Sequence, residues 1–322
     1  MTESTQISPT TWLGQPALAL ETSAVRLVTV PGMGAKIVSL FDKARGREWL
    51  LPPIGRPFRP AVYAASFVEQ DMSGWDEMFP TIEACAYPLA GPYAAALLPD
   101  HGEVWALPWS LEAGVPGTLS LSVEGRALPY RLTRTIRALE THTLRLQFEV
   151  VNTGAEDFIG LWTAHPQFVV DAGTRIVLPP QVGAVINVQP TAEWTDLGAL
   201  VPWPRATAAD GQTVALDRVR PASTQAHRKF YLPPESPVSW AALRQGAGGA
   251  WLRLAWDASA VPYLGIWVDE GDFNAAPTAA LEPSTGYYDS LALAAQNGRV
   301  VTFAPGQPVR WYLDVQLGAG SL

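Results

Sequence analysis

The stretch that decides the fold class is Thr-Leu-Arg-Leu-Gln-Phe-Glu-Val-Val, residues 143–151. Leucine, phenylalanine and valine occupy alternate positions here, and arginine, glutamine and glutamate occupy the positions between them. A period of two is typical of a β-strand with one buried face. The next residues, Asn-Thr-Gly at 152–154, favour a turn. The stretch therefore predicts a half-buried strand that ends in a reversal of the chain.

Short runs of β-branched and aromatic residues recur along the rest of the chain, each bounded by Gly, Pro, Asp or Asn. The 29 prolines and 27 glycines are spread throughout, so few segments of more than about ten residues can remain helical. Many short strands without helical segments between them favour an all-β sandwich or barrel over alternating helices and strands. The further strands are predicted at residues 25–30, 35–41, 119–123, 130–136, 158–163, 251–256, 264–268 and 309–316.

Composition indicates a well-packed chain of 322 residues. Hydrophobic residues make up 48% of the sequence and charged residues 16%, and a chain of this length buries roughly three quarters of its unfolded surface. We predict one domain over residues 1–322, since large sandwiches commonly form single domains. The stretch at residues 184–226, rich in Pro, Ala and Thr, is predicted to form an irregular excursion from it.

Charge and cysteine content argue against several kinds of partner. The net charge is -8, which does not suit binding to the phosphate backbone of nucleic acids. The uncharged residues 84–99 contain three prolines and cannot form a membrane helix. Residues 1–20 lack a basic segment and a continuous apolar run, so no secretory signal is predicted. Because Cys85 is the only cysteine, no internal disulfide can form. We expect a cytoplasmic protein without nucleic-acid or membrane partners.

Common cofactor and nucleophile motifs are absent from the sequence. It contains no phosphate-binding glycine loop of nucleotide enzymes, no dinucleotide fingerprint and no serine-hydrolase elbow. It also contains no His-Glu-x-x-His motif and no Cys/His spacing typical of zinc sites. We therefore expect neither a metal nor a cofactor.

Two of the four histidines lie in patterns that suit a binding site. His165 follows the apolar run 158–164 and precedes a proline, so we expect it at the end of a buried strand, at the rim of a sheet where clefts form. A core histidine with satisfied hydrogen bonds is the alternative. His101 follows Asp100 in a Pro-Asp-His-Gly turn, and a turn histidine bonded to that aspartate is its alternative.

Carboxylates in apolar surroundings are the other candidates. Glu282 lies between a leucine and a proline, and partial desolvation there raises a carboxyl pKa toward that of a general base. A turn-stabilising acid is the alternative. Trp75, Asp76 and Glu77 combine an aromatic ring with two carboxylates, a combination that suits sugars. Paired acids of a glycoside hydrolase are a second interpretation, and core packing of the aromatic residue is a third.

Three motifs then occur in a fixed order: His101-Gly102, His165-Pro166-x-Phe168, and Glu282-Pro283-x-Thr285-Gly286. This series resembles the aldose 1-epimerase family, the galactose mutarotase-like proteins. The resemblance extends from the strand at residues 34–40 to the last strand, which contains Trp-Tyr-Leu at 311–313. It implies one large antiparallel β-sandwich that holds a small-molecule sugar in an open cleft.

The resemblance also implies a reaction, the interconversion of the α and β anomers of a free aldose without metal or cofactor. Glu282 would be the base that takes the anomeric proton, and His165 the acid at the ring oxygen. His101 would bind the sugar near that oxygen, and Phe168 belongs to the same motif as His165. Asp269 is a possible counterpart of an aspartate that binds sugar hydroxyls in some members.

One departure from the family affects the substrate. Mutarotases carry an Asn-Arg pair that binds a sugar hydroxyl, and Gly-Trp-Asp-Glu stands here at residues 74–77. Trp75, Asp76 and Glu77 are therefore predicted to contact the sugar in its place. A non-catalytic carbohydrate-binding or regulatory protein of the same fold, and a lyase or glycoside hydrolase on a similar sandwich, are the alternatives.

Overall fold

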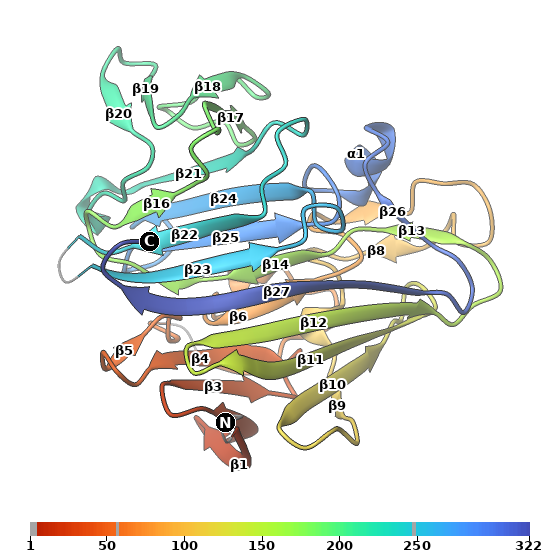
Figure 1. Cartoon of the computed structure of the whole chain (residues 1–322). Helices are drawn as coiled ribbons and strands as arrows, with labels where there is room; N and C mark the ends of the chain where they lie inside the picture. The colour runs from red at the N-terminus through yellow and green to blue at the C-terminus, as the bar shows by residue number, and fades with distance from the viewer. Residues whose placement is uncertain (1–4, 56–57, 247–248) are drawn as a thin grey trace.

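The computed structural model describes residues 5–55, 58–246 and 249–322, and β-strands dominate it (Figure 1). Neighbouring strands pair antiparallel and form two large sheets. The first sheet has thirteen strands. In spatial order they are β1 (Gln6–Trp12), β2 (Gln15–Glu21), β3 (Val25–Val30), β4 (Lys36–Asp42), β6 (Trp75–Met78), β14 (Thr163–Pro166), β25 (Thr278–Ser284), β24 (Tyr263–Glu270), β21 (Ala226–Tyr231), β17 (Ala184–Asn187) and β18 (Leu200–Pro202), with β5 (Arg47–Glu48) on β4 and β15 (Phe168–Val169) on β25.

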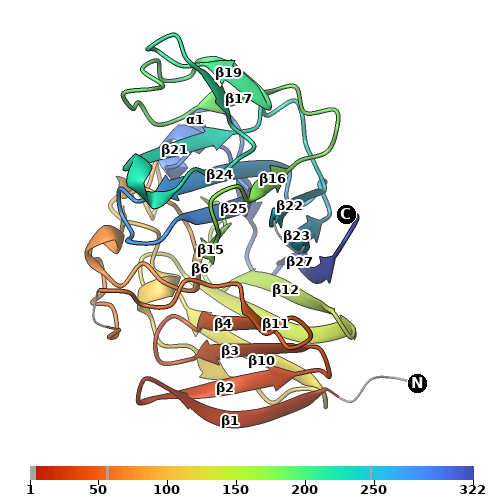
Figure 2. The same cartoon turned by 90° about the vertical axis from the view of Figure 1, so that its left-hand side faces the viewer.

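The second sheet has eight strands. In spatial order they are β16 (Arg175–Val177), β22 (Trp240–Arg244), β23 (Ala250–Trp256), β27 (Pro308–Ala319), β12 (Thr143–Asn152), β11 (Tyr130–Glu140), β10 (Thr118–Glu124) and β9 (Ser110–Leu111). Figure 2 shows the first sheet rising from β1 at the bottom to β17 at the top, with β27, β23 and β22 beside it. The main hydrophobic core contains residues of both sheets, so the fold is an antiparallel β-sandwich.

Smaller elements complete the described part of the chain. The α-helix α1 (Leu291–Gln296) begins at Ser290, whose hydroxyl accepts a hydrogen bond from the amide of Leu293. Three 3-10 helices cover Phe67–Glu69, Val104–Ala106 and Ala222–Thr224. The remaining strands form two-stranded sheets: β7 (Cys85–Ala86) with β8 (Leu97–Leu98), β13 (Phe158–Gly160) with β26 (Val301–Phe303), and β19 (Arg205–Thr207) with β20 (Thr213–Ala215).

The strand that decided the fold class is β12, and its predicted alternation is confirmed. Leu144, Leu146 and Phe148 are buried, whereas Gln147 is exposed. β12 pairs with β11 on one side and with β27 on the other, so it lies inside the second sheet. The buried row faces the first sheet, where the Phe148 ring lies 4.6 Å from that of Trp162.

Two expectations need correction. The single strand predicted at residues 158–163 is divided, because β13 pairs with β26 and the chain then passes through buried Leu161 and Trp162 to enter the first sheet as β14. The excursion at residues 184–226 is partly regular, because β17 and β18 extend the first sheet and β19 pairs with β20. These strands have three or four residues each, too few to give a clear alternation.

The burial pattern of β12 predicts unequal costs for neighbouring truncations. Leu146→Ala should lower the free energy of unfolding by about 2–5 kcal/mol, because it leaves a cavity between the sheets. Gln147→Ala, on the opposite face of the same strand, should change it by less than about 0.5 kcal/mol. Denaturant unfolding of both variants measures the difference. Equal losses would contradict the assigned register.

Candidate active site

Four consecutive strands of the first sheet place side chains around one cavity of about 260 Å³. These are His165 on β14, Glu282 on β25, Trp267 on β24 and Lys229 on β21. Leu281, next to Glu282, belongs to the core between the sheets. Since successive side chains of a strand point to opposite faces, the cavity lies on the outer face of the first sheet.

Loops surround this floor of strands. The first is the 3-10 helix Phe67–Glu69, the second precedes β7, and the third contains the predicted turn at residues 99–102. Their side chains and those of neighbouring segments form the wall of the cavity. This wall includes Phe67, Glu83, Asp100, His101, Gln167 and Gln189.

His165 and Glu282 meet across two paired strands. Thr163 pairs with Ser284, so two residues further along the antiparallel ladder His165 faces Glu282. The distance from His165 Nε2 to Glu282 Oε1 is 3.4 Å, and the two side chains are 8% and 2% exposed. A titratable pair that is almost fully buried at the floor of a cavity is the pattern expected of an acid–base site.

Burial raises the pKa of Glu282 to about 7. Lys229 opposes this rise by stabilising the carboxylate, and the negative charge of Asp289 adds to it. Glu282 Oε2 has no hydrogen-bond partner among the described residues. The carboxyl group can therefore gain or lose a proton near neutral pH, and one of its oxygens is free to accept one.

Burial has the opposite effect on the imidazole and lowers the pKa of His165 well below its ordinary value. His101, when it is protonated, and the positive charges of Lys229 and Lys36 lower it further. The side-chain nitrogen of Gln167 lies 3.2 Å from Nε2, and Nδ1 has no partner among the described residues. His165 is therefore neutral at physiological pH and keeps a ring nitrogen available.

The room for Glu282 comes from a glycine on the next strand. Gly265 on β24 pairs with Glu282, and a Cβ atom at this glycine would lie 2.9 Å from Glu282 Oε2. It would also lie 3.0 Å from the ring of Tyr231 on β21. Any larger residue at position 265 would displace the carboxylate or the tyrosine, so the glycine fixes where the carboxylate can lie.

His101 completes the aromatic part of the wall. Its ring stacks on that of Phe67 at 4.2 Å and lies 5.1 Å from the ring of His165. Its Nδ1 is 2.7 Å from Asp100 Oδ1, the turn contact that the sequence offered as an alternative. The turn depends on Gly102, where φ is +69° and a Cβ would collide with the backbone of Phe79.

The predicted contacts from β6 are not in the cavity wall. Trp75 and Glu77 face the second sheet, where Glu77 forms a 3.0 Å ion pair with Arg134 and accepts a 2.9 Å hydrogen bond from the Trp162 indole. Asp76 lies on the outer face opposite His165, but it is buried beneath the cavity and forms a 2.8 Å ion pair with Lys36. Alternation along β6 separates the two acids.

Phe168 and Asp269 are not in the wall either. Phe168 is fully buried and packs edge to face on Trp75, at 5.9 Å, so it belongs to the core. Asp269 accepts hydrogen bonds from four successive backbone amides, those of residues 271–274. It thereby shapes the loop that carries Phe273, which does line the cavity. Its effect on the cavity is indirect.

Sequence reasoning missed Lys229, Trp267 and Glu83. Lys229 and Trp267 are paired residues on β21 and β24, and both point to the outer face. The signal that could have found them is a large or charged side chain on the outward positions of strands that were otherwise apolar. Nothing in the local sequence of Glu83 distinguishes it from an ordinary surface acid.

Among the residues that the structure describes, no group of three or more His, Cys, Asp or Glu side chains could hold a metal ion. No helix within those residues is long and apolar enough to span a membrane.

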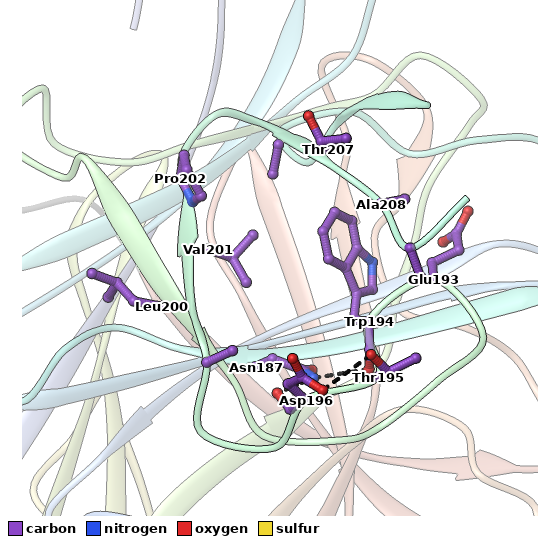
Figure 3. A pocket seen from close by; sticks show the side chains of 13 residues that line it. Asn187, Glu193, Trp194, Thr195, Asp196, Leu200, Val201, Pro202, Thr207 and Ala208 are labelled. Carbon is purple, nitrogen blue, oxygen red and sulfur yellow. Dashed lines mark hydrogen bonds between the residues drawn. The ribbon is translucent and has the colours of Figure 1, made fainter. Parts of the chain in front are cut away.

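A second cavity, of about 250 Å³, lies within the segment 184–226 that the sequence predicted to be irregular (Figure 3). Trp194 stands on one side of it and Val201 on the other. Two of its polar side chains are engaged within the protein: the Asn187 amide donates to the carbonyls of Trp194 and Asp196, and Glu193 is paired with Arg220. This cavity contains no histidine and no acid–base pair.

Comparison with known proteins gives a fold but no close relative. No protein-family model and no curated protein matches the sequence. Among solved structures, the Slr1438 protein of Synechocystis superposes with a TM-score of 0.72 at 16% identity, over 99% of both chains. A galactose mutarotase-like protein of Clostridium acetobutylicum gives 0.69 at 14% identity, over 98% of this chain and 99% of that one. A galactose mutarotase related enzyme of Lactobacillus acidophilus gives 0.67 at 14%, over 94% and 97%.

The chain has the galactose mutarotase-like fold. This confirms the all-β sandwich class and the likeness predicted from the three ordered motifs. At 14–16% identity these three structures establish the architecture alone.

The raised pKa of Glu282 predicts a dependence of stability on pH that Glu282→Gln removes. Between the ordinary pKa of 4.5 and the folded value of about 7 the native state binds the extra proton, so stability falls as pH rises through this range. From pH 5 to pH 8 the wild type should lose about 2 kcal/mol relative to the variant. Denaturant unfolding of both proteins at both pH values measures this. Parallel pH profiles would contradict the assignment.

Proposed function

We propose that this protein is a mutarotase, which interconverts the α and β anomers of a free aldose by general acid–base catalysis. One observation carries the proposal: a buried carboxyl group with a pKa of about 7 lies 3.4 Å from a neutral, buried imidazole at the floor of a cavity. Ring opening needs a base at one oxygen and an acid at another. The galactose mutarotase-like fold supports the same reaction.

Glu282 is the proposed base. Its free oxygen takes the proton of the anomeric hydroxyl, and the C1–O1 bond becomes a carbonyl. The electrons of the bond between C1 and the ring oxygen move to that oxygen, which gains a proton, and the open-chain aldehyde results. Rotation about the C1–C2 bond and the reverse transfers give the other anomer. Each transfer of this kind accelerates a reaction by roughly 10²–10⁴-fold.

His165 is the proposed acid. A neutral imidazole can polarise an oxygen and donate its N–H proton, and it needs no positive charge in the cavity to do so. The two transfers are coupled: as Nδ1 gives its proton to the sugar, Nε2 receives the proton that Glu282 has taken, over the 3.4 Å contact, so no imidazolate forms. The pair therefore ends each half-reaction with the same number of protons, and no charge accumulates at the buried floor.

The wall of the cavity suits a pyranose ring. Trp267, which is only partly buried, offers an aromatic ring against which the C–H groups of a sugar can pack. His101 and Gln189 offer polar atoms for hydroxyl groups. A mostly apolar cavity with a few convergent polar groups is the usual form of a small-molecule site.

Of the alternatives, a non-catalytic sugar-binding protein has one observation in its favour: no arginine of the described residues lines the cavity. The lyase or glycoside hydrolase alternative has lost its basis. Asp76 and Glu77 lie on opposite faces of β6, each bound to its own cation.

Replacing the base without changing its shape tests the proposal. Glu282→Gln should lower the enzyme-catalysed exchange of anomeric protons at least 100-fold, because an amide cannot take the proton. Exchange NMR of a panel of free hexoses and pentoses measures the rate. Glu140→Gln, at an exposed position of β11, is the matched control and should retain the wild-type rate. Sugar binding in calorimetry without any exchange by the wild type would favour the non-catalytic alternative.

The pH profile tests the assignment of roles. Activity should rise about tenfold per pH unit below 7 and level off above it, because the carboxylate form of Glu282 grows through a pKa of about 7. His165 stays neutral over this range, so its titration should add no second inflection to the pH profile near pH 6.5. If activity instead falls between pH 6 and 8, a protonated histidine is the acid, and the assigned roles are wrong.

A further inference from the structure

We propose that the cavity selects its sugar by charge: it admits uncharged and amino-substituted aldoses and rejects phosphorylated and carboxylated ones, and Glu83 sets this selection. The inference rests on the proposed function and names the substrate class of the same site. It follows from which charged groups reach the cavity and from which of them already have partners.

Among the described residues, the cavity wall contains three carboxyl side chains, those of Glu83, Asp100 and Glu282, and one lysine, Lys229. The ammonium of Lys229 is 2.9 Å from the buried Asp289 carboxylate. The Asp289 oxygen that it contacts also accepts a 2.6 Å hydrogen bond from Tyr231. Lys229 is thus neutralised from behind, and among the described residues of the wall the carboxyl groups outnumber the lysine.

Phosphate and carboxylate groups are normally held by arginine, by unpaired lysine or by backbone amides at a helix N-terminus. No arginine among the described residues lines this cavity, and the only cation in its wall is the paired Lys229. A phosphorylated sugar would lose its hydration and gain no matching partner. Its binding would be opposed by like charges, which is an effective way to reject a ligand.

Glu83 differs from the other acids of the wall because its carboxylate is uncommitted. Asp100 is held by His101 at 2.7 Å and by the amide of Phe67 at 2.8 Å. Glu83 is exposed, and its carboxylate has no hydrogen bond or ion pair with any described residue. Desolvation raises its pKa, and the negative charges of Asp289 and Asp100 add to this rise, whereas Lys229 and His101 oppose it.

The position of Glu83 determines which part of the sugar it meets. The anomeric carbon must lie against His165 and Glu282, which are almost fully buried at the floor of the cavity. Glu83 is exposed, so it lies at the mouth. A substituent on the distal part of the ring, such as a 6-phosphate or a 6-carboxylate, therefore points toward Glu83, whereas an ammonium group gains from the negative wall throughout the cavity.

The test compares sugars of one configuration that differ in charge. For the configuration that the wild type accelerates most among glucose, galactose and mannose, exchange NMR gives kcat/KM for the neutral sugar, its 2-amino-2-deoxy form, its 6-phosphate and its uronic acid. The amino sugar should match or exceed the neutral sugar, and the two anionic forms should fall at least 30-fold below it. Rates for the anionic forms within threefold of the neutral sugar would overturn the proposal.

Charge reversal tests the role of Glu83. Glu83→Lys should raise the ratio of kcat/KM for the 6-phosphate to kcat/KM for the neutral sugar at least tenfold. Glu140→Lys, an equal change of net charge at an exposed site on β11, should leave this ratio unchanged. An equal response of both variants would show that net charge, and not Glu83, sets the selection.

Calorimetry separates this inference from the proposed function. If the neutral sugar binds but no anomer exchange is catalysed, the mutarotase proposal fails, and the charge selection is then judged from the dissociation constants of the same four sugars. Tight binding of the 6-phosphate would overturn the selection independently. If the wild type neither binds nor exchanges any of them, both proposals fail.

Discussion

The floor of the candidate site depends on side-chain alternation along neighbouring strands of the first sheet. On β14, Ala164 packs in the core and His165 points to the cavity, and on β25 the same holds for Leu281 and Glu282. A slip of one residue in either strand would exchange the two faces. On the neighbouring strand β6, the same alternation directs Glu77 between the sheets. There an ion pair with Arg134 compensates its buried charge.

Burial is the common cause of the chemistry at the floor. It raises the pKa of the carboxyl group and lowers that of the imidazole, so both shifts favour an uncharged pair over an ion pair. Buried charges elsewhere in the same region are compensated, as in the 2.8 Å contact between Lys36 and Asp76. Glu282 Oε2 and His165 Nδ1, in contrast, are left without protein partners among the described residues. Unsatisfied polar atoms of this kind are costly and are retained where a ligand uses them.

The sequence was sufficient for the fold class and for the central site residues, and insufficient for the wall. Alternation in residues 143–151 predicts a half-buried strand because one face packs and the other meets solvent, and the ordered motifs place His101, His165 and Glu282 together. Trp75, Glu77 and Phe168 were expected to contact the sugar but lie outside the cavity wall, because aromatic and acidic residues in sequence do not reveal which face of a strand they occupy. Lys229 and Glu83 reach the cavity through strand pairing and loop packing over long sequence distances, which local patterns do not encode.

The central claim is that a free sugar binds with its anomeric carbon against His165 and Glu282. A crystal structure of the Glu282→Gln variant, soaked with the sugar whose anomers the wild type exchanges fastest, tests this most directly. The account predicts the anomeric oxygen within hydrogen-bond distance of the residue 282 side chain and the ring oxygen within reach of the His165 imidazole. A sugar bound in the cavity beside Trp194, or bound with its anomeric carbon toward Glu83 at the mouth, would contradict it.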